Sequence, residues 1–71
     1  MDVSEQIHDK AKSMLTDVIK SDILNDPDHS KKVTENVLDL YTANEVGITI
    51  DVLVLITIIR TELRIFTSVL D

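Results

Sequence analysis

Glu5 and His8 place a carboxylate and an imidazole one helical turn apart, the unit that di-iron helical bundles use in duplicate. Here we find no second pair at inward positions, and no further carboxylate falls at an inward position of the predicted helices. A metal-dependent helical protein is therefore only the second alternative for function. We expect no bound metal and no other cofactor.

Asp26, Asp28 and Ser30 alternate in the way that oxygen ligands open a calcium loop. Such a loop needs glycine at its sixth position and a bidentate glutamate at its twelfth, but Lys31 and Val37 stand there. The two aspartates are therefore interpreted as helix-capping residues.

The remaining chemistry is sparse, because the chain has no cysteine and only one glycine. No serine is flanked by turn-forming glycines beside a positioned histidine, and a single glycine excludes a glycine-rich phosphate loop. We expect a protein that is not an enzyme.

A net charge of −6 argues against nucleic acid or an anionic membrane surface as the partner. The basic clusters, Lys31 with Lys32 and Arg60 with Arg64, have no aromatic residues interleaved that could stack on bases. Ten of the thirteen acidic residues lie in residues 1–46, so a basic protein surface is the expected partner of this half. The predicted acidic partner face consists of Asp17, Asp22, Asp26, Asp28 and Asp39.

The first residues show neither the basic region nor the apolar region of a secretory signal, so a cytoplasmic protein is expected. The most apolar run, residues 52–59, holds eight residues, against the roughly 20 that a membrane span needs. We therefore predict no membrane span.

Pro27 and Gly47 are the only proline and the only glycine, and they divide the 71 residues into three segments of helix length. The sequence predicts helices over residues 3–24, 27–43 and 49–70 in a single helical domain of residues 1–71. Asp26 is the expected N-cap of the second helix, with Pro27 in its first position. Asn44 or Gly47 is expected to adopt the left-handed conformation that ends this helix.

Apolar residues recur at three- and four-residue spacing in the first two segments, as in amphipathic helices. The predicted apolar face of the first helix is Ile7, Ala11, Met14, Leu15, Val18 and Ile19, and that of the second is Val33, Val37, Leu40 and Tyr41.

The third segment is apolar on more faces than one neighbouring stripe can cover. A heptad seam runs along it, while Leu53, Val54, Leu55 and Ile58 occupy the other faces of its first half. The seam consists of Val52, Ile56, Ile59, Leu63, Phe66 and Leu70. We therefore predict that this helix packs against another chain. The predicted interface consists of Val52, Leu55, Ile56, Ile59, Leu63, Phe66 and Leu70.

Residues 48–59 are also rich in β-branched side chains, which favour strands. The three-and-four spacing of residues 61–70, with no turn before them, favours a helix instead. A strand remains the alternative for this segment.

The fold expected is all-α: a small three-helix unit, assembled as a homodimer or a larger helical bundle through the C-terminal helix. The expected function is that of a small acidic regulatory or adaptor protein acting by protein–protein association. The first alternative is a structural subunit that assembles with itself.

Overall fold

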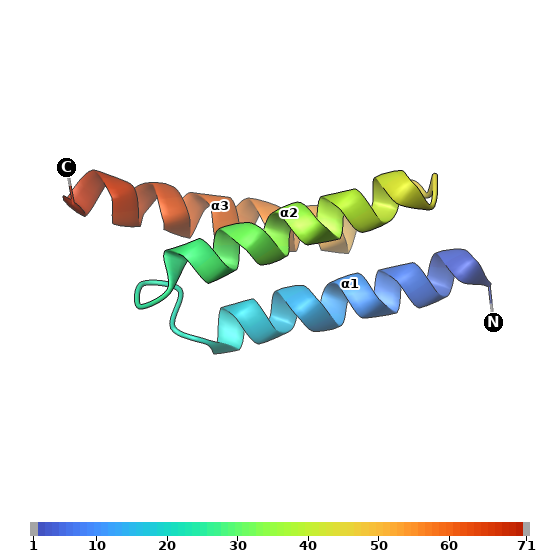
Figure 1. Ribbon diagram of the computed structural model, residues 1–71, viewed down its shortest axis with the longest axis horizontal. Coiled ribbons are helices and arrows are strands. Elements are labelled where there is room, and N and C mark those ends of the chain that lie inside the picture. The colour runs from blue at the N-terminus through green and yellow to red at the C-terminus, as the bar shows by residue number, and fades with distance from the viewer. Residues whose placement is uncertain (1, 71) are drawn as a thin grey trace.

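A computed structural model describes the backbone of residues 2–70 and the side chains of residues 2–68. Three helices run back and forth along the long axis: α1 (Val3–Lys20), α2 (Pro27–Ala43) and α3 (Ile50–Leu70) (Figure 1). Each helix contacts both others. The all-α, three-helix prediction is confirmed. The strand alternative for residues 48–59 is wrong, because residues 50–59 belong to α3 and residues 48 and 49 precede it.

The start of α1 follows the expected capping chemistry, but its end does not. The Asp2 side chain caps the helix by accepting a hydrogen bond from the Ser4 N–H at 3.3 Å. The helix stops at Lys20, four residues before the predicted end, because Ser21 and Asp22 bind the backbone locally. The Ser21 hydroxyl donates to the Val18 carbonyl at 2.7 Å, and the Asp22 carboxylate accepts from the Leu24 N–H at 3.1 Å. Such local bonds compete with helix continuation.

The start of α2 is where the sequence places it. The Asp26 carboxylate accepts a hydrogen bond from the His29 N–H at 3.1 Å, and Pro27 opens the helix. Proline is tolerated there because its missing N–H has no intrahelical partner in any case.

The end of α2 differs from the expected cap, because Glu45 and neither Asn44 nor Gly47 takes the left-handed conformation, with φ of 54°. The Val46 N–H donates to the Tyr41 carbonyl at 3.1 Å and the Glu45 N–H to the Thr42 carbonyl at 3.2 Å. These two bonds form a Schellman motif, in which the residue after the cap must be left-handed. Glu45 takes this conformation because it directly follows the cap residue Asn44, although glycine would suit the position better.

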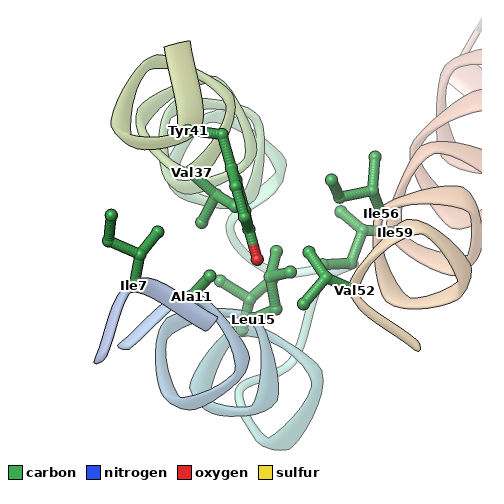
Figure 2. Close-up of a cluster of buried hydrophobic side chains, with 9 residues drawn as sticks. Ile7, Ala11, Leu15, Val37, Tyr41, Val52, Ile56 and Ile59 are labelled. Atoms are coloured by element: carbon green, nitrogen blue, oxygen red, sulfur yellow. The ribbon is translucent and has the colours of Figure 1, made fainter. Parts of the chain in front are cut away.

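Aliphatic side chains from all three helices meet along the axis of the bundle, with the Tyr41 ring reaching from α2 toward the other two helices (Figure 2). The buried core consists of Ile7, Ala11, Leu15, Val18, Val37, Tyr41, Val52, Ile56 and Ile59. On α2 the buried face differs from the predicted one, since Ser30 and Thr34 are buried while Val33 and Leu40 are half-buried. The Ser30 hydroxyl donates to the Asp26 carbonyl at 3.2 Å and the Thr34 hydroxyl to the Ser30 carbonyl at 2.9 Å, so neither buries an unsatisfied donor.

Among the residues described, no helix is both long enough and apolar enough to cross a bilayer.

Replacing Glu45 by glycine is expected to stabilise the fold. A left-handed non-glycine residue costs about 1–2 kcal/mol, and glycine's greater freedom in the unfolded chain offsets about half of the gain. Glu45→Gly should therefore raise the melting temperature by roughly 4 °C in a thermal melt followed by circular dichroism.

Two control variants separate this effect from charge and from glycine content. Glu45→Gln removes the same charge but keeps the strained conformation, and should leave the melting temperature nearly unchanged. Gly47 has no left-handed φ and no atom within 4 Å of an added Cβ, so Gly47→Ala should be tolerated. A destabilised Glu45→Gly variant would contradict the assignment of the cap.

Candidate functional site

The predicted interface residues of α3 lie mainly against the other helices of the same chain. Val52, Ile56 and Ile59 are at most 2% exposed. The other predicted members are Leu55, Leu63 and Phe66, which are half-buried, and Leu70, whose side chain lies outside the described residues. A second chain could reach the buried three only if the bundle opened. Oligomerisation stays a prediction, and the exposed apolar side chains of α3 are a different set.

The opposite side of α3 carries apolar side chains that are 44% to 82% exposed. We call this set the outward face: Ile50, Leu53, Val54, Ile58 and Ile65. With 3.6 residues per turn, these positions point away from the buried seam. A contiguous exposed apolar patch of this kind marks an interaction site more often than scattered single residues do.

Two threonines on this side add to its apolar character. The Thr57 hydroxyl donates to the Leu53 carbonyl and the Thr61 hydroxyl to the Thr57 carbonyl, each at 2.9 Å. Because each hydroxyl hydrogen is used within the helix, the methyl groups contribute to the outer surface. The outward face therefore extends from Ile50 in the first turn of α3 to Ile65 in the fifth, with the two threonines between.

The residues of the predicted acidic partner face are all exposed, but they do not form one compact surface. Asp17, Asp22, Asp26 and Asp28 lie at or beside the connection between α1 and α2, whereas Asp39 lies about 16 Å further along α2. The carboxylates of Asp22 and Asp26 also accept backbone hydrogen bonds. Four of the five predicted residues therefore gather at the α1–α2 connection, and Asp39 does not belong to this surface.

A group of polar side chains lies where the start of α1 meets the end of α2 and the start of α3; we call it the polar cluster. The Tyr41 hydroxyl and His8 Nδ1 share a hydrogen bond of 2.6 Å, and their ring centroids are 5.2 Å apart. Lys12 Nζ forms an ion pair with Asp51 Oδ2 at 3.1 Å. Thr49 Oγ1 is buried nearby and has no partner of ordinary hydrogen-bond geometry. These contacts tie the three helices together at one end of the bundle.

The polar cluster shifts the pKa of two of its members. Burial raises the pKa of the Tyr41 phenol, the Thr49 hydroxyl partly opposes this shift, and the charge of Asp51 adds to it. The nearby Thr49 hydroxyl and then the Lys12 ammonium lower the pKa of Asp51 to about 2. Both effects favour the ionised carboxylate, so Asp51 is charged across the neutral range.

No local pattern in the sequence signals the polar cluster. The bonded pair of His8 and Tyr41 is 33 residues apart, and His8 was paired with Glu5 only by helical spacing. Glu5 is exposed, and within the described part of the chain no group of three potential metal-ligating side chains comes together. An open groove beside the cluster is lined by Lys12 and Asp51 but not by His8 or Tyr41. The contact that the imidazole and the phenol make is between α1 and α2.

A second groove lies between α2 and α3, near the opposite end of the bundle, and has a volume of about 640 Å³. We call it the basic groove because Lys31, Arg60 and Arg64 line it, with Glu35 as its one acidic residue. In the sequence Lys31 is far from Arg60 and Arg64, so local spacing does not join the three cations. The antiparallel course of α2 and α3 brings these cations together.

Comparison of the chain with models of protein families, with curated proteins and with solved structures finds no match.

The pKa of Asp51 makes a test of the polar cluster. The ionised Asp51 carboxylate stabilises the fold fully above the ordinary aspartate pKa of 3.8, and this stabilisation is lost as the pH falls through about 2. Urea unfolding of the wild type and of Asp51→Asn should therefore show a stability difference that is constant above pH 5 and shrinks between about pH 4 and pH 2.

Carboxyl NMR titrations assign the cause of the shift. Thr49→Val and Lys12→Met should each raise the pKa of Asp51 toward 3.8, whereas Lys10→Met, on the same helix, should leave it unchanged. An unaltered Asp51 pKa in both of the first two variants would refute the proposed contacts.

Proposed function

We propose that this protein is a small acidic adaptor of the cytoplasm that associates with a second copy of itself and presents its α1–α2 connection to a basic protein surface. The outward face of α3 is the observation that carries the proposal. Its five aliphatic side chains stay exposed after α1 and α2 have covered the buried seam.

The side chains of the outward face suit a helix–helix contact. Four of them are isoleucine or valine, whose χ1 angle is already restricted in a helix. Ordering them at an interface therefore costs less conformational entropy than ordering longer, flexible side chains.

The distribution of charge favours a second copy as the occupant. Two chains that meet through α3 hold their α1 and α2 surfaces away from each other, and these helices with their connections hold ten of the thirteen acidic residues. Packing through α1 or α2 would instead bring two negatively charged surfaces together. A twofold contact between identical faces also closes, which limits the assembly to a dimer.

The native mass of the full chain tests this function, by sedimentation or native mass spectrometry at micromolar concentration. The wild type should be a dimer, and Val54→Lys combined with Ile58→Lys should be a monomer, because lysine ammonium groups cannot be buried there without a partner. The matched control combines Val3→Lys with Leu24→Lys, which changes equally exposed residues and the same charge away from α3. It should remain a dimer.

Circular dichroism establishes that each variant is folded. The proposal would be contradicted by a wild type that stays monomeric at micromolar concentration, or by a double variant of α3 that is as dimeric as the control. Large polydisperse particles would instead support the alternative of a structural self-assembling subunit.

A further inference from the structure

The basic groove gathers three of the seven basic residues of a chain whose net charge is −6. Lys31 and Glu35 stand one turn apart on α2, and Arg60 and Arg64 stand one turn apart on α3. Leu63 of α3, which is half-buried, adds an aliphatic side chain to the lining. None of the three cations has an ion-pair partner within 4.0 Å among residues 2–68.

The hydroxyl groups of the groove are already engaged. Thr34 donates to the Ser30 carbonyl at 2.9 Å, Thr67 to the Leu63 carbonyl at 2.9 Å, and Ser68 to the Arg64 carbonyl at 3.0 Å. The side-chain donors left for a ligand are therefore the lysine ammonium and the two guanidinium groups.

We propose that the basic groove binds a short carboxylate-rich segment of another protein, with an aliphatic side chain of that segment resting on Leu63. Each guanidinium presents a planar fork that matches a carboxylate with two parallel hydrogen bonds. Cationic side chains beside an aliphatic one complement a peptide in which acidic and aliphatic residues are neighbours. This site is separate from the outward face of α3 and takes a ligand of opposite charge to the partner of the acidic connection.

A peptide fits the groove better than a phosphate group or a nucleic acid does. Phosphate sites in proteins converge backbone N–H groups at a helix start, whereas the groove lies along the interior turns of two helices, where these groups are bonded within the helix. A nucleic acid extends beyond the groove and would meet the negative remainder of the chain.

Binding of a labelled Glu-Leu-Glu-Glu-Leu-Glu peptide with blocked ends tests the proposal, by fluorescence anisotropy at 50 mM salt. Arg60→Gln combined with Arg64→Gln should weaken binding at least tenfold. Lys10→Gln combined with Lys20→Gln changes the net charge equally on exposed positions of α1 and should change binding less than twofold. Glu35→Gln should tighten binding, which is a change that damaged folding would not produce.

Further measurements identify the occupant. The same peptide with glutamine in place of glutamate should not bind, and Leu63 methyl resonances should shift only with the acidic peptide. Equal binding by the arginine and lysine variants would overturn the site. If inorganic phosphate at equal concentration displaced the peptide, the proposal would be overturned, and the groove would be a site for a small anion. If a peptide with this chain's residues 20–30 bound more tightly, the occupant would be a second copy of this chain and not another protein.

Discussion

The packing of the α3 seam against α1 and α2 is the contact on which the rest of the structure depends. Val52, Ile56 and Ile59 are buried there, and they supply the share of the core that neither other helix can provide. A chain of this size has no disulfide to add stability, so its aliphatic core must be nearly complete. Once the seam is covered, α3 still has its outward face. The proposed dimer follows from that surplus.

The heptad spacing of α3 identifies which side chains are buried, but not which chain buries them. A seam covered by two helices of the same chain and a seam covered by a second molecule have the same sequence pattern. The outward face could be found in the sequence only as the residues left after the seam is assigned. Ile50 is the most exposed of them, and no periodicity separates it from the buried Val52 without knowledge of the neighbours.

Helix starts were predictable because they depend on one or two neighbouring residues, as Asp26 and Pro27 show. The helix ends depended on competition between helical and local hydrogen bonds, which the residue types alone do not decide. Ser21 and Asp22 end α1 by bonding to the nearby backbone, and Glu45 takes a left-handed conformation because it stands next after the cap residue. Ser30 and Thr34 were missed as core residues for a related reason. Their hydroxyls bond within α2, so they can be buried as small side chains despite their polarity.

Contacts between distant residues account for both polar sites, and this is why neither could be derived from local spacing. Lys12 pairs with Asp51 of α3 and not with a residue of its own helix. The basic groove likewise needs the antiparallel placement of α2 beside α3, which joins Lys31 to Arg60 and Arg64. The two sites use their charge differently. Lys12 and Asp51 neutralise each other, whereas the cations of the groove have no such partner among the described side chains. In a chain with nearly twice as many acids as bases, unpaired cations gathered in one groove leave a local positive potential that an acidic ligand could neutralise.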